Sequence, residues 1–231
     1  RRGDLEAARR YAQMMSKLTD EMVEAAKKLL YYMGIPCIQA PGEGEAQAAY
    51  ITIRGDSWAT ASQDYDSLLF GSPRLVRNLT ISGKRKLPRK NVYIEVKPEI
   101  VELDKVLKYL GVTRSQLIDI AILIGTDYNP EGVRGVGPKR ALTLIKTHGS
   151  LEKVIPLLKA EFPEDPIKIR EYFLNPTVTD NYKIEWSEPD EKCLVDFLCG
   201  EYDFSKSRVN HAIERLKKAY RENIKVKQMG L

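Results

Sequence analysis

The chain has 231 residues, of which 43% are hydrophobic and 30% charged, a composition typical of a soluble globular core of one domain or slightly more. Its 37 Lys and Arg exceed its 32 Asp and Glu, and the net charge of +5 permits nucleic-acid binding without requiring it. No apolar run approaches the roughly 18 residues of a membrane-spanning helix. General disorder and a membrane protein are therefore excluded.

The cysteines and the first residues indicate where such a chain would be found. Cys37, Cys193 and Cys199 form no CxxC pair, so we expect a reducing compartment and no cysteine chemistry. The chain starts without Met or an apolar signal segment and runs directly into a charged helical pattern. We therefore expect it to be part of a longer protein.

The first 97 residues or so predict an α/β arrangement. Apolar residues spaced by three and four predict a helix over 5–33, and a second helix is predicted over 44–53. Short apolar runs predict strands at 35–38, 58–61 and 68–70. Alternating strands and helices favour parallel strands, whose carboxyl ends carry the chemistry in open α/β sheets.

A basic segment follows. Residues 74–77 and 91–96 are predicted strands, and the loop 84–90 between them has five basic residues in seven, starting with Lys84, Arg85 and Lys86. This loop is either a solvated surface or a phosphate contact. Beyond Pro98 only helices are predicted, at 99–110, 114–124, 138–148, 151–158, 167–174, 190–198 and 205–220.

Five acidic residues stand at the ends of predicted elements. Glu43 and Glu45 begin the helix 44–53, Asp64 and Asp66 follow a predicted strand, and Asp127 follows an apolar helix. Each group has a simpler explanation, namely a helix N-cap, an Asp-rich turn and a helix C-cap. The last is unfavourable, because the negative end of a helix dipole disfavours an anion.

Taken together, the five acids predict a site for a hard cation. Carboxylates without His or Cys suit Mg²⁺ or Mn²⁺, and crowding them without metal would cost free energy through repulsion. Two ions would relieve this repulsion and support phosphodiester hydrolysis. Zinc is not expected, since His148 and His211 stand apart, and no Gly-x-Ser-x-Gly motif indicates a serine hydrolase.

A Gly-x-Gly turn joins the predicted helices 114–124 and 138–148. It follows a helix and lacks the GxGxxG spacing, so it does not fit a Rossmann loop. A helix-hairpin-helix over about 114–148 that binds the DNA backbone fits better, because glycines admit a phosphate to the helix amides. Its candidate DNA-binding residues are Arg134, Gly135, Gly137, Lys139 and Arg140.

Four of these segments resemble the signature of the structure-specific 5' nuclease family. They are 41–46, 63–71, 125–128 and 134–141, and the segments 186–189 and 197–200 are similar to flap endonucleases, most of all archaeal ones. The resemblance covers nearly the whole chain. It implies a PIN-like α/β core with a parallel sheet, plus a helical layer that contains the helix-hairpin-helix, also called a helix-two-turn-helix.

The resemblance also implies three regions and an activity. Residues 1–34 would be the return helix of the family's arch, 35–97 the inner part of the nuclease core, and 98–231 the helical region. The implied enzyme uses two Mg²⁺ ions, replaceable by Mn²⁺, to cut 5'-flap DNA by endonuclease and 5'-3' exonuclease action in Okazaki fragment maturation and repair. The five acids would be its catalytic and metal-binding residues.

Further expectations follow from the family. Backbone carbonyls near Gly132, Val133 and Val136 would hold K⁺ in the hairpin. Arg9, Arg10 and Lys17 would face the flap, although a plain solvated face explains them equally well. The intact protein would be a monomer that binds the sliding clamp, cytoplasmic in an archaeon and nuclear in a eukaryote.

The chain departs from the family pattern in three ways. Gly42 stands where Ser is common, the clamp-binding tail is absent, and the N-terminal third with two further aspartates is absent. We therefore expect this chain alone to be a weak or inactive nuclease.

Two other functions remain open at this stage. One is a non-catalytic, sequence-independent DNA-binding fragment in which the acids are structural. The other is a small-molecule phosphatase, which would not need the hairpin. Salt-dependent duplex binding and metal-dependent cleavage of flap against linear DNA would separate the three.

Overall fold

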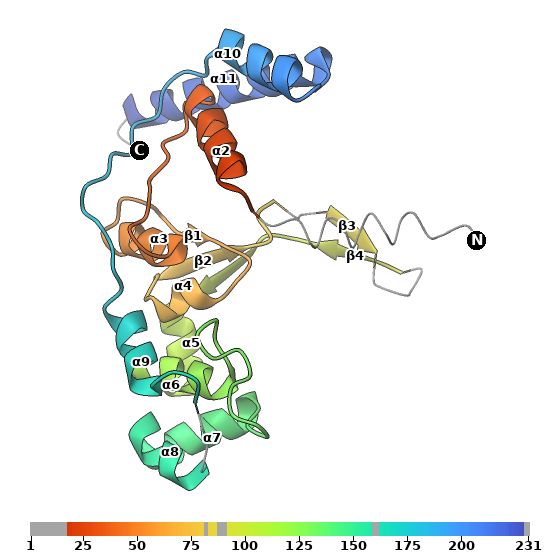
Figure 1. The fold of residues 1–231 in the computed structure, drawn as a ribbon. Coiled ribbons are helices and arrows are strands. Elements are labelled where there is room, and N and C mark those ends of the chain that lie inside the picture. The colour runs from red at the N-terminus through yellow and green to blue at the C-terminus, as the bar shows by residue number, and fades with distance from the viewer. Residues whose placement is uncertain (1–17, 81–82, 87–91, 159–161, 229–231) are drawn as a thin grey trace. The chain divides into compact units, whose positions relative to one another are not determined.

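The computed structural model describes residues 18–80, 83–86, 92–158 and 162–228 (Figure 1). The chain divides into two compact units, one made of Arg1–Ile38 with Tyr182–Leu231 and the other of Gln39–Asn181. In the described part of the chain, no helix is long and apolar enough to cross a membrane. The predicted region boundaries near residues 34 and 97 stay predictions.

The second unit contains a three-stranded sheet with the order β1-β2-β5. β1 (Thr60–Ala61) runs parallel to β2 (Arg74–Arg77), and β5 (Glu99–Glu102) pairs antiparallel with β2. Thr60 lies opposite Leu75 in the first pair, and Arg77 lies opposite Glu99 in the second. The expected parallel pairing is confirmed for β1 and β2, and β5 adds an antiparallel edge.

Three short segments differ from the sequence prediction. Residues 68–70 were expected to be a strand, but Leu68 and Leu69 lie in α4 (Asp66–Leu69), because a short buried helix gives the same apolar run as a buried strand. Residues 99–102 are β5 rather than helix, and the helix begins only at Leu103. Residues 35–38 belong to no strand of the described structure.

A separate two-stranded sheet replaces the predicted basic loop over part of its length. β3 (Gly83–Lys86) pairs antiparallel with β4 (Tyr93–Val96), with Gly83 opposite Val96. The predicted strand at 91–96 is therefore confirmed for β4, while 84–86 is strand rather than loop. Residues 87–90 lie outside the described ones.

Helices form the remainder of the second unit. They are α3 (Gly44–Ile53), α5 (Leu103–Leu110), α6 (Arg114–Ile124), α7 (Pro138–His148), α8 (Leu151–Leu158) and α9 (Pro166–Leu174). α6 starts at a capping box in which Thr113 and Gln116 satisfy each other's backbone amides. α7 starts with Pro138 after the N-cap Gly137, a combination that favours helix initiation. The predicted helices 44–53, 114–124, 138–148 and 151–158 are confirmed at these bounds.

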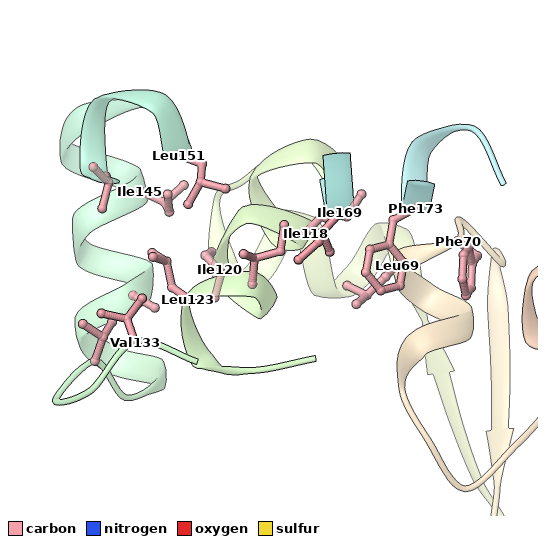
Figure 2. Packing of buried hydrophobic residues seen from close by; sticks show 14 of the residues in the cluster. Leu69, Phe70, Ile118, Ile120, Leu123, Val133, Ile145, Leu151, Ile169 and Phe173 are labelled. Atoms are coloured by element: carbon pink, nitrogen blue, oxygen red, sulfur yellow. The ribbon is translucent and has the colours of Figure 1, made fainter. Parts of the chain in front are cut away.

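One hydrophobic core joins α3, α6, α7, α8 and α9 to α4 (Figure 2), while Leu103 of α5 belongs to a second cluster with Leu68 and Leu75. Ile118 of α6, Ile145 of α7 and Phe173 of α9 are fully buried in it. Phe70, just after α4, packs on Phe173 with ring centroids 4.9 Å apart. The loop that precedes α4 and the hairpin that precedes α7 are therefore anchored to the same core.

The first unit is helical. It comprises α2 (Asp20–Tyr32), α10 (Glu191–Val195), the π-helical turn η1 (Asp196–Glu201) and α11 (Lys206–Gln228). Leu194, Val209 and Ile213 form its buried cluster. Gly34 follows α2 with φ +71°, and a Cβ there would lie 2.1 Å from the carbonyl oxygen of Ser187, so only glycine fits. The predicted helix 5–33 is confirmed from residue 20 onward.

Candidate active site

Glu43 and Glu45 are presented by the start of α3. Ala46 and Ala49 bury one side of this helix, and the Gln47 side chain bonds in both directions to the backbone of Thr179. Glu43 occupies the N-cap position, yet its side chain makes no capping hydrogen bond. Capping therefore does not account for this carboxylate.

Asp64 lies on the turn between β1 and α4, and Asp66 is the first residue of α4. The backbone amide of Ser62 donates to the Val76 carbonyl, 3.2 Å away, and the Ser62 hydroxyl accepts from the amide of Asp64 at 3.1 Å. The same hydroxyl donates to the carboxylate of Glu45. Ser62, which sequence reasoning did not single out, thus connects this turn to the start of α3.

Asp127 lies in a turn that follows α6. Gly125 ends the helix with φ +130°, and a Cβ there would lie 2.7 Å from the carbonyl oxygen of Pro130. The buried side chain of Asn129 accepts from the Thr126 hydroxyl and donates to the Ile122 carbonyl, both at 2.7 Å. The turn is therefore closed by hydrogen bonds to its own helix, while Asp127 is exposed.

The structure brings three of the five acids to one cavity of about 530 Å³. The residues that line it are Gln63, Asp64, Tyr65, Asp66, Arg77, Gly125, Thr126, Asp127 and Pro130. Neither histidine is among them. Glu43 and Glu45 do not line the cavity, but they act on it through their charge.

Burial and the neighbouring carboxylates raise the pKa of two of the acids, Asp66 and Glu45. Burial, followed by the charges of Glu45, Asp127, Glu43 and Asp64, raises the pKa of Asp66 to about 6. Burial is also the largest cause that raises the pKa of Glu45, with Asp64, Glu43 and Asp127 adding to it. Negative charge at Asp66 and Glu45 is therefore disfavoured by burial and, in addition, by the carboxylates around them.

Tyr128, which follows Asp127, holds the side chain of Glu43. Its hydroxyl donates to the Glu43 carboxylate, and its ring packs on Tyr172 and Phe173 at centroid distances of 5.1 and 5.8 Å. Burial and the bond to Glu43 raise the pKa of Tyr128, so the phenol stays protonated as a donor. The sequence placed Tyr128 inside a motif but gave it no role.

The donor set fits a hard cation. Carboxylate oxygens are the ligands that Mg²⁺ prefers, and a cation would relieve the repulsion that, after burial, raises the pKa of Asp66. As the side chains stand, no group of three or more His, Cys, Asp or Glu among the described residues is arranged to hold a metal ion. The fit therefore rests on the chemistry and charge of the donors.

The hairpin is built on the turn that carries Asp127. The amide of Gly132 donates to the Asn129 carbonyl and that of Val133 to the Leu123 carbonyl, both at 2.9 Å. Val133 and Val136 are buried, so the segment between them turns outward. The same short stretch of chain therefore supports both the acidic cavity and the hairpin.

The predicted DNA-binding residues occupy the exposed side of the hairpin. Gly135 has φ +78°, and Gly137 leaves the first amides of α7 without a side-chain cap. Arg134 and Lys139 are exposed, whereas Arg140 donates to the Gly135 carbonyl at 3.1 Å and helps to close the turn. The arrangement offers free amides and positive charge at one place.

Six further residues were predicted to contact DNA, and these contacts stay predictions. Arg9, Arg10 and Lys17 lie outside the described residues. Lys84, Arg85 and Lys86 belong to β3, and their part in binding stays a prediction.

The fold is that of a PIN-like nuclease. Residues 34–127, which include all five acids, match the family described as the XPG I-region. Flap endonuclease-1 from Methanococcus jannaschii is similar in structure, with a TM-score of 0.76 and 43% identity over 94% of this chain and 64% of that one. The catalytic core of Rad2 in complex with DNA substrate gives a TM-score of 0.70 at 23% identity, covering 92% and 72% of the two chains.

Sequence relatives narrow the class further. The chain is 68% identical to flap endonuclease 1 of Staphylothermus marinus and 65% identical to that of Hyperthermus butylicus, in each case over 100% of this chain and 66% of the relative. The chain belongs to the flap endonuclease family. It spans 66% of the length of these two relatives.

Proposed function

We propose that the protein containing this chain hydrolyses phosphodiester bonds in 5'-flap DNA, as an endonuclease and as a 5'-3' exonuclease, during replication and repair. The observation that carries the proposal is the joint placement of Asp64, Asp66 and Asp127 around one cavity, in the same unit as the hairpin. The names and identities of the archaeal relatives support it.

The acids would act as metal ligands. Two Mg²⁺ ions, for which Mn²⁺ would substitute, supply water activation and charge stabilisation for phosphodiester hydrolysis when they are bound. The residues that would hold them are Glu43, Glu45, Asp64, Asp66 and Asp127. Tyr128 and Ser62 donate hydrogen bonds to Glu43 and Glu45, which orients these carboxylates before a cation arrives.

The hairpin would hold duplex DNA by its backbone. Gly135 and Gly137 let a phosphate approach the uncapped amides of α7, and Lys139 adds positive charge. Such contacts fix the position of the DNA without reading its sequence. We further propose that carbonyls of Gly132, Val133 and Val136 hold K⁺ here, and duplex binding in K⁺ against Li⁺ would test this.

The remaining proposals concern the oligomeric state, the protein partner and the location of the intact protein. We propose that it is monomeric, contacts the sliding clamp and works in the cytoplasm if its source is an archaeon, or in the nucleus if it is a eukaryote. Light scattering of the full-length protein with and without clamp tests the first two points.

Cleavage of a 5'-flap substrate separates this function from DNA binding alone. The full-length protein is expected to cut flap DNA faster than linear duplex and only with Mg²⁺ or Mn²⁺. The 231-residue chain is expected to bind duplex but to cut it weakly. Binding of flap DNA by the full-length protein without cleavage at any metal concentration would favour the non-catalytic function.

A further inference from the structure

Arg77 lines the acidic cavity but is not among the residues proposed to bind metal or DNA. It is the last residue of β2, and it lines the cavity together with Asp64 and Asp66. Its side chain is only 23% exposed. A largely buried cation beside uncompensated carboxylates needs a physical explanation.

The guanidinium group of Arg77 contacts both neighbours of Asp64. Its Nε donates to the carbonyl oxygen of Gln63 at 3.0 Å, and its Nη1 donates to the hydroxyl of Tyr65. It also lies over the Tyr65 ring, 4.1 Å from the centroid. One rigid, planar group therefore holds the backbone before Asp64 and the side chain between Asp64 and Asp66.

The sheet holds Arg77 in turn. Glu99 is its partner in the antiparallel register, and Nη1 of Arg77 lies 3.7 Å from Oε2 of Glu99. This ion pair partly neutralises the guanidinium and restricts where it can point. The turn that carries the two acids is thereby tied to the β2–β5 pair.

We propose that Arg77 is a positioning residue, which raises the affinity of the acidic site for divalent cations by holding the turn at 62–66 in one conformation. The inference rests on the proposed function, because it assumes that Asp64 and Asp66 bind metal. Partners of metal ligands commonly contribute 10- to 100-fold in affinity.

If Arg77 acted only through its positive charge, its removal would change the metal affinity in the opposite direction. A positive charge close to the acids repels an incoming cation, so its removal alone would tighten metal binding. Loss of positioning instead weakens metal binding even when the charge is kept. Arg77→Met and Arg77→Lys therefore separate the two effects.

Arg74 provides a matched control on the same strand. Its Nε donates to the carbonyl oxygen of Trp58 at 3.2 Å, and its guanidinium lies 5.0 Å from the centroid of the Trp58 ring. It thus makes the same kinds of contact at the opposite end of β2, and it does not line the cavity. Arg74→Met removes equivalent packing without touching the acidic turn.

Calorimetric titration of the full-length protein with Mn²⁺, without DNA, measures the effect directly. We expect Arg77→Met and Arg77→Lys each to weaken Mn²⁺ binding by roughly tenfold or more. Arg74→Met is expected to leave Mn²⁺ affinity unchanged. Affinity for flap DNA in the absence of metal is expected to stay at the parent level in all three variants.

A milder variant covers the case in which Arg77→Met does not fold. Tyr65 is 50% exposed, so Tyr65→Phe removes one hydroxyl acceptor at little cost to packing. It is expected to weaken Mn²⁺ binding in the same direction, by less than Arg77→Met.

Four results would overturn the inference. Tighter Mn²⁺ binding by Arg77→Met would mean that Arg77 acts only through its charge. Unchanged Mn²⁺ binding would mean that Arg77 has no effect on the site. Weaker flap binding with unchanged Mn²⁺ affinity would make Arg77 a phosphate contact instead. A parent protein that binds no Mn²⁺ would remove the proposed function itself, whereas a normal parent with unaffected variants would remove only the role of Arg77.

Discussion

Asn129 shows how a single buried side chain can hold a functional turn. Its backbone amide donates to the Thr126 carbonyl and its carbonyl accepts from Gly132, while its side chain bonds to Thr126 and Ile122. With 2% exposure, it has no water to replace these partners. Asp127 lies between the bonded residues, so its position depends on this amide.

Replacement of Asn129 by Ala is expected to destabilise the protein by about 1–3 kcal/mol, because the Thr126 hydroxyl and the Ile122 carbonyl lose their partner in a buried place. Urea unfolding measures this, with Asn181→Ala at an exposed position as the control. Equal stability of the two variants would mean that water readily takes the place of the Asn129 side chain.

Gly137 tests the hairpin without disturbing the fold. It has φ −89°, and a Cβ built there meets nothing within 4 Å. Gly137→Val is therefore expected to fold normally, yet to weaken duplex binding, because the side chain obstructs the approach of a phosphate to the amides of α7. Mn²⁺ affinity should not change. Filter binding measures the duplex affinity, and calorimetry measures the Mn²⁺ affinity. Unaltered duplex binding would mean that the hairpin is only a structural turn.

Lys139 tests the charge at the same place. It is exposed at the start of α7, so one phosphate contact is expected to depend on it. Lys139→Ala should reduce the slope of log K against log salt by about 0.9, without creating a base preference. Equal slopes for the parent and the variant would show that Lys139 makes no phosphate contact. The basic residues of β3 would then be the next candidates for DNA binding.

At the scale of elements, an ion-pair network connects three helices of the second unit. Arg170 of α9 bonds to Glu152 of α8 and to the buried Asp119 of α6, and Asp119 also accepts from the amide of Leu151. The bonds to Arg170 lower the pKa of Glu152 to about 2. Burial raises the pKa of Asp119 despite the same guanidinium.

The network predicts a dependence of stability on pH. Because the folded pKa of Glu152 is lower than its usual 4.5, its ionised form stabilises the fold above about pH 4.5, and this contribution is lost as the pH falls toward 2. Its side chain is 48% exposed, so solvent screening keeps the effect modest. The melting temperature of the parent should exceed that of Glu152→Gln at pH 6, with a gap that narrows below about pH 4.5 and closes toward pH 2. A gap independent of pH would contradict the assignment.

Element prediction from the sequence succeeded where the pattern was long. Helices α6 and α7 each span 11 residues and have recognisable starts at Thr113 and Pro138. The short α4 was missed, because four buried residues carry too little pattern to separate a helix from a strand. β5 was missed because its apolar residues run directly into α5.

At the scale of the whole molecule, the sequence proposed five acids for the site, and the structure places three of them around one cavity. The sequence did not indicate the contacts that hold these acids. Element ends and motif resemblance were sufficient to propose Asp64, Asp66 and Asp127. Arg77 contacts Tyr65, 12 positions away in the sequence, and Tyr128 contacts Glu43, 85 positions away. A local sequence pattern cannot predict such contacts. The available signal was a tyrosine next to an acid, since Tyr65 stands between Asp64 and Asp66 and Tyr128 follows Asp127.

The central claim is that the acids around the cavity perform the chemical step rather than hold DNA or stabilise the fold. Asp66 is the most informative position, because it lines the cavity and the charges of the other four acids act on it. The test is the single-turnover cleavage rate of 5'-flap DNA by full-length Asp66→Asn at saturating Mg²⁺. We predict a rate at least roughly 100-fold below that of the parent, with metal-free flap binding unchanged. A rate within a few fold of the parent would contradict the account.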